Sequence, residues 1–258
     1  MLAPHEEALI RFDPSTHQLR RVMQCLERTG RTVCMAFSSN SVRMLQRPTA
    51  ASLQLTSWTS FTGIQLGISM VIGDICFEVE TAALLSVLRA VETQSSGTMT
   101  VLSRTLQIVG GERVGIPGSV LHELSITPTE SVSEPTVARP HITFHLPLGI
   151  RRVVSLEGTV EVAANAAGTV VTSVETALLT CRLRYSGVRV VQGGLDDRQR
   201  LISISVPIKL LGRTLGVLGY LPGATLLCSI IPDQTLIISV SLPDQPNVMT
   251  VYIPSFSP

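Results

Sequence analysis

The sequence predicts an α+β protein made of two like halves, each with the element order β-α-βββ-β-α-βββ and mostly antiparallel sheets. Three observations lead to this prediction. Residues 75–104 lie over residues 202–231 without a gap, so one strand–helix–strand unit occurs twice in the 258-residue chain. Short runs rich in Val, Ile, Leu and Thr recur between turn residues, as is typical of strands. Helical spacing of apolar residues interrupts these runs twice in each half.

The first half begins with a predicted helix after Pro14, with Ser15 as its N-cap and Gly30 at its end. Leu19 and Met23 mark its apolar side. A second helix is expected over residues 81–94 on the same kind of spacing. The predicted strands of this half cover residues 32–37, 41–45, 52–56, 64–72, 75–79, 98–102, 106–109 and 113–121.

The pattern changes between Ser125 and Pro140, where prolines punctuate Ser, Thr and Glu and no apolar period remains. Such a composition is typical of a linker. We therefore expect a first domain over residues 1–124, an interdomain connector over 125–140 and a second domain over 141–258.

The second half repeats the order of the first. A strand over 141–146 precedes a short helix over 147–157, and strands follow through residues 160–190. A strand over 201–206, a helix over 208–221 and three strands that end near Phe256 complete the prediction.

The composition favours a folded, intracellular protein. Apolar residues make up 45% of the chain and charged residues 15%, with a mean hydropathy of +0.37. The uncharged run over 215–232 is broken by Pro222-Gly223, so it indicates a helix, a turn and a strand rather than a membrane span. The N-terminal residues lack the pattern of a signal peptide. The five scattered cysteines have no C-x-x-C spacing, which predicts buried reduced thiols: Cys25, Cys34, Cys76, Cys181 and Cys228.

Basic residues lie opposite the apolar side of every predicted helix. They are Arg21 and Arg28 in the first helix, Arg89 in the second, Arg151 with Arg152 beside it in the third, and Lys209 with Arg213 in the fourth. No carboxylate lies at the centre of these faces. An ordinary solvated face is the alternative for any single helix, but solvated helices usually mix charge signs. Four basic faces in a chain of net charge +1 indicate binding to a phosphate backbone.

Candidate catalytic and metal-binding residues do not form a known constellation. His141 and His145 share one face of a predicted strand but have no evident third ligand. Gly110-Gly111 and Gly193-Gly194 lack the sequence context of a phosphate-binding loop. Asp196-Asp197 is a lone acidic pair in a polar loop, which we expect to be solvated. We therefore predict no enzyme activity, no metal and no cofactor.

Four segments, in their order and spacing, resemble those of a DNA-clamp family. They are Phe77 to Ala90, Val114-Gly-Ile-Pro, His141-Ile-Thr-Phe-His-Leu-Pro-Leu and Val251-Tyr-Ile-Pro-Ser-Phe-Ser. The chain is similar to eukaryotic sliding clamps, and more closely to the Hus-one subunit of the DNA-damage checkpoint clamp. The similarity covers nearly the whole chain and is weakest before Leu66.

The resemblance implies two tandem sliding-clamp domains, with sheets outside and helices on the inner face. Such a subunit joins relatives of the Rad-nine and Rad-one types head to tail in a nuclear ring around double-stranded DNA, independently of DNA sequence. A clamp loader and factors that dock near the connector complete the implied partners, without a cofactor or a membrane. Carried over by position, the DNA-facing residues are Arg21, Arg28, Arg31, Arg89, Arg151, Arg152, Lys209 and Arg213.

The resemblance also implies that edge strands near 113–121 and 177–185 join the subunits. The candidate interface residues are Arg113, Val114, Ile116, Leu121, Leu179, Cys181 and Leu183. Pro117 suits an edge strand, since proline cannot donate within a central strand. The chain departs from clamp channels in having Lys209 as its single lysine.

Two alternatives remain open. A replicative clamp that closes as a homotrimer accounts for the same features. A β-rich protein that binds an apolar ligand accounts for the hydrophobic composition but not for the basic helix faces.

Overall fold

The computed structural model describes residues 8–14, 17–39, 41–48, 55–94, 96–111, 119–152, 156–176, 179–193, 198–216, 221, 223–242 and 245–256. The chain divides into two compact units. Unit 1 comprises Met1–Arg47 and Trp58–Glu134, and unit 2 comprises Pro48–Ser57 and Pro135–Pro258.

Unit 1 is a mostly antiparallel β structure with two α-helices among its described residues. Its elements are β1 (Ala8–Phe12), α1 (Gln18–Thr29), β2 (Thr32–Phe37), β3 (Val42–Gln46), β4 (Thr56–Phe61), the 3-10 helix η2 (Ile64–Leu66), β5 (Ile68–Ile72), β6 (Ile75–Glu80), α2 (Thr81–Val91), β7 (Gly97–Leu102), β8 (Thr105–Gly110) and β9 (Val120–Pro128).

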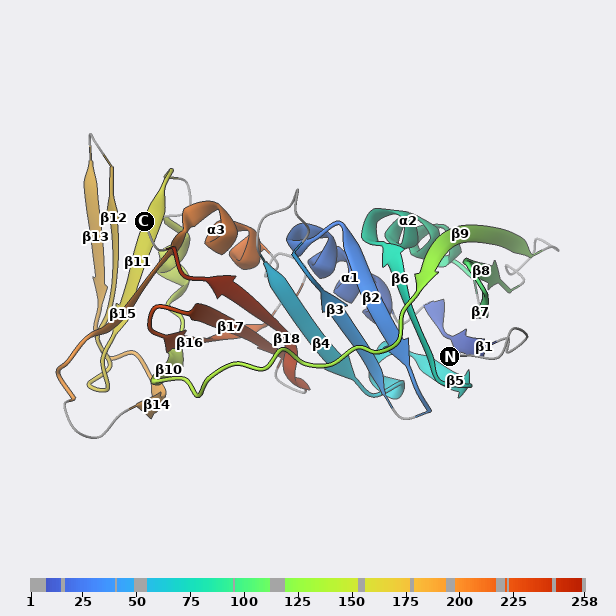
Figure 1. Ribbon diagram of the computed structural model, residues 1–258, viewed down its shortest axis with the longest axis horizontal. Helices are drawn as coiled ribbons and strands as arrows, with labels where there is room; N and C mark the ends of the chain where they lie inside the picture. Colours follow the sequence, from blue (N-terminus) through green and yellow to red (C-terminus); the bar gives the residue numbers. More distant parts are fainter. Residues whose placement is uncertain are drawn as a thin grey trace. The chain divides into compact units, whose positions relative to one another are not determined.

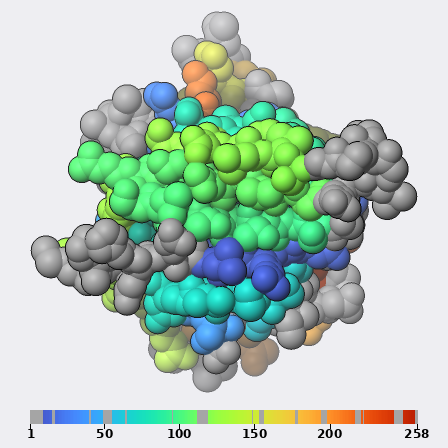
Figure 2. All heavy atoms as spheres, turned by 90° about the vertical axis from the view of Figure 1, so that its right-hand side faces the viewer, coloured from blue at the N-terminus to red at the C-terminus, as the bar shows by residue number. Residues whose placement is uncertain are grey.

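The strands of unit 1 follow the order β4-β3-β2-β6-β9-β8-β7-β1-β5. β9 joins two parts of this sheet, because residues 120–125 pair with β8 and residues 126–128 pair with β6. Alternate strand residues are buried, as in Leu106 and Ile108 of β8. The helices α1 and α2 contact each other (Figure 1). In Figure 2, β8 and β9 (green), β1 (blue) and β5 (cyan) form one continuous surface.

Unit 2 has the same order of strands. Its elements are β10 (Ile142–His145), the 3-10 helix η3 (Leu148–Arg152), β11 (Thr159–Ala164), β12 (Val170–Glu175), β13 (Thr180–Tyr185), β14 (Val190–Gly193), β15 (Ile202–Pro207), α3 (Ile208–Gly216), β16 (Thr225–Ile231), β17 (Thr235–Leu242) and β18 (Gln245–Pro254).

Unit 2 forms two sheets, with the orders β14-β10-β16-β17-β18 and β13-β12-β11-β15 (Figure 1). The pairings repeat those of unit 1: β10 pairs with β14 and β16, as β1 pairs with β5 and β7. β6 with α2 and β15 with α3 begin at corresponding positions of the sequence repeat. The duplicated architecture predicted from the sequence is therefore confirmed, with nine strands among the described residues of each unit where the pattern predicts eight. In unit 1 the strand missing from the prediction is β1, which precedes the first helix.

The helix predicted over 147–157 is wrong over its described residues. The structure has a 3-10 helix, Leu148–Arg152, while residues 153–155 lie outside the described part of the chain. Gly149 lies within this segment, and a glycine in a helix interior costs about 1 kcal/mol relative to alanine, which disfavours a long α-helix. The segment also approaches β13 closely, because a Cβ added at Gly149 would lie 2.8 Å from the Tyr185 hydroxyl.

Other boundaries differ by a few residues. α3 ends at Gly216, before the predicted end at 221, and residues 217–220 lie outside the described part. β4 covers Thr56–Phe61, so it shares only Thr56 with the predicted strand 52–56, of which residues 52–54 lie outside the described part. η2 occupies the start of the predicted strand 64–72. β9 runs to Pro128 and so includes the first residues of the expected connector. Regular pairing with β6 explains this extension, since Thr127 and Pro128 lie opposite Glu78 and Phe77.

The five cysteines are free thiols. Cys25 and Cys228 are buried, whereas Cys34, Cys76 and Cys181 are partly exposed, so the prediction of burial is correct for two of them. Burial raises the pKa of Cys25 to about 12 and that of Cys34 to about 11. Within the described residues, no helix is long and apolar enough to cross a membrane.

Candidate functional site

The two helices of unit 1 bury their apolar sides and turn basic side chains outward. In α1, Leu19 and Met23 are buried while Arg28 is exposed and Arg21 is half-buried. In α2, Leu84 and Leu88 are buried while Arg89 is exposed. The 3.6-residue period explains this division, because residues three and four apart share a side of a helix.

Unit 2 presents its basic residues in the same way on a shorter helix. Leu210 and Leu211 of α3 are buried, and Lys209 and Arg213 are exposed. The polar residue Thr214 is also buried, and its hydroxyl donates to the Leu210 carbonyl at 3.0 Å. The described parts of α2 and α3 contain no carboxylate, so these outward faces carry positive charge alone.

The predicted DNA-facing residues differ in how they are held. Among the described residues, no ion-pair partner lies beside Arg21, Arg89, Lys209 or Arg213. Arg31, in contrast, lies 3.4 Å from Glu80 between its Nε and the carboxylate Oε1, and both side chains are well exposed. Such an exposed pair is weak and leaves the guanidinium available.

The two arginines of η3 contact their own unit. Arg151 donates from Nη2 to the Leu215 carbonyl at 3.3 Å, near the C-terminal end of α3. A cation is favourable there because helix carbonyls concentrate negative charge. Arg152 lies near Tyr185: burial raises the pKa of Tyr185, and the Arg152 guanidinium opposes that shift. Both arginines remain exposed.

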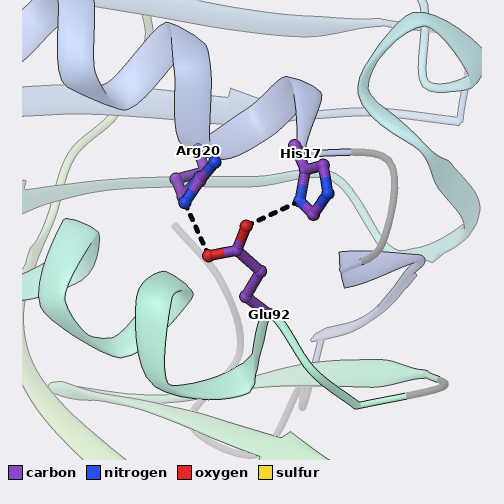
Figure 3. Close-up of polar contacts among 3 residues, drawn as sticks. All are labelled: His17, Arg20 and Glu92. Carbon is purple, nitrogen blue, oxygen red and sulfur yellow. Dashed lines mark hydrogen bonds and ion pairs between the residues drawn. The ribbon is translucent and has the colours of Figure 1, made fainter.

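A three-residue ion cluster that the sequence did not indicate links α1 to α2 (Figure 3). Glu92, just after α2, lies 3.0 Å from His17 Nδ1 through Oε1 and 2.5 Å from Arg20 Nη1 through Oε2. His17 precedes α1 in a left-handed conformation with φ of 57°. Glu92 therefore neutralises Arg20 at the start of α1, while Arg21 next to it has no such partner. Arg20 and Glu92 are 72 positions apart, so no local pattern could reveal the pair.

A buried polar contact joins the other ends of the same two helices. The Gln46 side chain of β3 lies 2.5 Å from the Thr29 hydroxyl at the end of α1. Its Nε2 also donates to the Thr81 hydroxyl, at the first position of α2, over 3.4 Å. All three side chains are buried. Both ends of the helix pair are thus tied by polar contacts.

The predicted interface residues that the structure describes lie on or beside β13 and β9. β9 lies between β6 and β8, and its residues 120–125 pair with β8 while 126–128 pair with β6. β13 is the last strand of its sheet, and its residues alternate between exposed and half-buried. Cys181 and Leu183 are half-buried, and the preceding Leu179 is 51% exposed. Leu121 of β9 is 52% exposed. Arg113, Val114 and Ile116 lie outside the described residues.

Charge distinguishes these two strands from each other. β13 carries Arg182 and Arg184 as exposed side chains, whereas β9 carries exposed Glu123. Glu123 accepts a hydrogen bond from Gln107 of β8 at 2.7 Å. The two strands thus present opposite charges beside exposed apolar residues.

No group of three or more His, Cys, Asp or Glu side chains in the described chain is arranged to hold a metal ion. His141, just before β10, is exposed, and His145, the last residue of β10, is half-buried. A cavity beside α1, lined by Phe12, Pro14, His17, Arg20 and Leu88 among others, has a volume of about 10 Å³. It has room for about one water molecule.

Comparisons with known proteins agree with this architecture. The chain matches the family described as Hus1-like protein over residues 10–257. The crystal structure of the proliferating cellular nuclear antigen from Entamoeba histolytica is similar, with a TM-score of 0.70 and 13% sequence identity, over 97% of this chain and 99% of that chain. No curated protein sequence matches. The chain has the sliding-clamp fold and belongs to the family of Hus1-like proteins.

Proposed function

We propose that this chain is a non-catalytic subunit of a heterotrimeric checkpoint clamp, which encircles double-stranded DNA at damage sites in the nucleus. In this role it serves as a platform for checkpoint signalling and repair factors. The observation that carries the proposal is the basic surface of α1, α2 and α3, of which α2 and α3 hold no carboxylate in their described parts, in a chain that belongs to the Hus1-like family.

Exposed arginines on short rigid helices suit a phosphate backbone. Each phosphate that a cation neutralises releases counterions, so affinity arises without reading base sequence. Arg21, Arg89, Lys209 and Arg213 carry this role best, because the described residues place no carboxylate against them. Arg28 of α1, Arg31 just after α1, and Arg151 and Arg152 of η3 remain DNA-facing candidates.

The ring requires two edges, and we assign them to β9 and β13. Pairing between edge strands of different subunits satisfies backbone groups and covers exposed Leu121 and Leu179. The partners in this proposal are a Rad-nine-like and a Rad-one-like subunit, and a clamp loader opens the ring. The positively charged β13 selects an acidic partner edge, and β9 with Glu123 selects a basic one.

Opposite charges on β9 and β13 also fit a second copy of this chain, which supports the homotrimeric replicative clamp as a second candidate. Size measurement separates the two. Light scattering of the purified chain should give the single-chain mass of 27.7 kDa, and co-expression with two clamp-like partners should give a one-to-one-to-one complex. A mass of roughly three chains for the isolated protein would favour the homotrimer instead.

Edge variants make this measurement specific. Leu179→Asp should abolish the complex, because it places a carboxylate beside an edge that must pair. Ile72→Asp is a matched control, since Ile72 is 51% exposed on β5, an edge that the ring does not use. Equal loss of the complex in both variants would remove the support for a β13 interface.

A further inference from the structure

Three short segments of unit 2 meet at the turn between β11 and β12. The Val188 N–H donates to the Gly168 carbonyl at 2.9 Å, and the Ala167 N–H donates to the Arg198 carbonyl at 3.1 Å. Asn165 Nδ2 donates to the Gln199 carbonyl at 3.2 Å. These bonds hold the residues before β14 and before β15 against one turn.

A glycine permits this close approach. Gly168 has φ of +82°, and a Cβ added there would lie 2.6 Å from the Val188 carbonyl oxygen. A Cβ at Gly193, the last residue of β14, would lie 3.2 Å from the Ala166 Cβ. The backbone around the turn is therefore closely packed and positions the side chains that leave it.

Arginines dominate the side chains that leave this junction. Arg189 follows Val188, Arg198 provides one of the bonded carbonyls, and Arg184 lies opposite Val171 at the start of β12. All three are exposed, as is nearby Arg200. No described carboxylate lies within ion-pair distance of Arg184, Arg189 or Arg198; Asp196 and Asp197 lie outside the described residues. Glu175 lies opposite Thr180 at the far end of β12.

Apolar side chains and an open strand edge lie beside these arginines. β14 pairs with β10 and is the last strand of its sheet. Val191 of β14 is 56% exposed, and Leu201, next to Arg200, is 42% exposed. An edge strand can accept an extended peptide through backbone hydrogen bonds, and flanking side chains then select the peptide.

We propose that this junction, formed by β14, Arg189 and Arg198, binds an acidic extended segment of a partner protein. The segment adds a strand to the edge of β14 and covers Val191, while its carboxylates accept hydrogen bonds from Arg189 and Arg198. Guanidinium groups suit this task because their planar donors match a carboxylate in pairs. The exposed valine and the strand edge favour a protein segment over a nucleic-acid backbone, which offers neither an apolar side chain nor a strand. The inference does not depend on the ring or on the basic helices.

Binding of a labelled peptide that alternates Glu and Val tests the inference on the full-length chain. Fluorescence anisotropy should show binding that weakens with salt, and the matched Gln–Val peptide should bind much more weakly. Arg189→Glu with Arg198→Glu should lower the affinity at least about tenfold. Val191→Asp should lower it as well, through repulsion of the peptide carboxylates. Arg104→Glu, an exposed arginine of unit 1, is the matched control and should change little.

A labelled DNA duplex separates this surface from the basic helices. Arg213→Glu should weaken duplex binding and leave peptide binding unchanged, and the Arg189–Arg198 double variant should do the reverse. Equal peptide binding by the wild type and the double variant would overturn the inference, as would equal binding of the Gln–Val peptide. Loss of duplex binding without any peptide binding would show a nucleic-acid surface instead. Unchanged melting temperatures confirm that the variants are folded.

Discussion

Gln46 gives the sharpest stability prediction, because its buried amide joins the end of α1 to the start of α2. Gln46→Ala removes the contacts with Thr29 and Thr81, and each buried neutral hydrogen bond is worth about 1 kcal/mol net. It also removes one buried methylene, worth about 0.8 kcal/mol, and leaves a cavity in place of the amide. Thr29 still donates to the Leu26 carbonyl, but Thr81 loses its donor. We therefore expect a loss of about 3 to 4 kcal/mol in the free energy of unfolding of unit 1.

Urea denaturation of the full chain measures this loss, and Gln107→Ala is its matched control. Gln107 makes a 2.7 Å side-chain bond to Glu123 on the exposed face, so the same substitution should cost less than about 1 kcal/mol. Hydrogen exchange should also show faster opening at the last turn of α1 in Gln46→Ala. Equal destabilisation by the two substitutions, or no change in either, would refute the assignment of Gln46 as a tie between the helices.

Three further predictions concern single contacts. Glu92→Gln keeps the side-chain shape but removes the charge that holds His17 and Arg20, so thermal unfolding should show a loss of about 1 kcal/mol; no loss would mean that the cluster in Figure 3 adds nothing to stability. Gly168→Ala places a Cβ against the Val188 carbonyl at positive φ, and should cost at least about 1 to 3 kcal/mol, whereas Gly187→Ala, also at positive φ but with open space, should cost less. Burial raises the pKa of Cys25 to about 12, so the folded state retains a thiol proton that the unfolded state releases above about pH 9; stability is intact below that pH and should fall by about 1 kcal/mol for this thiol by pH 10. Cys25→Ala should remove that part of the alkaline loss in urea titrations, and an unchanged pH dependence would contradict the assignment.

The repeated strand–helix–strand unit could be predicted because its signals are local. Alternation in Ile75–Glu80 and helical spacing in Thr81–Val91 predict β6 and α2. The same signals in the second copy of the repeat predict β15 and α3. The predicted helix over 147–157 failed because Gly149 weakens a helix there and also for a non-local reason. Its apolar spacing fits a helix, but the close approach of Gly149 to Tyr185 accompanies a single 3-10 segment there.

The extent of β9 was also hidden from the sequence. Its residues are mostly exposed and Pro128 resembles the start of a linker, so the composition predicts that the strand ends earlier. Pairing with β6 extends the strand to Pro128. Periodicity predicted outward faces for Arg89, Lys209 and Arg213, which the structure exposes, and for Arg21, which is half-buried. It could not show that Arg151 contacts the Leu215 carbonyl or that Arg20 meets Glu92, since these contacts join residues distant in the chain.

Photocrosslinking to duplex DNA shows which faces of the chain lie against the DNA. A photoreactive residue is placed at Arg89 or Arg213 on the helices, or at Gln107 or Ser173 on sheet faces, in the complex assembled with its clamp partners. If the helices face the DNA, the helix positions should give crosslinks that fall with salt, and the sheet positions should give none. Crosslinks from Gln107 or Ser173 that equal those from Arg89 and Arg213 would contradict this orientation.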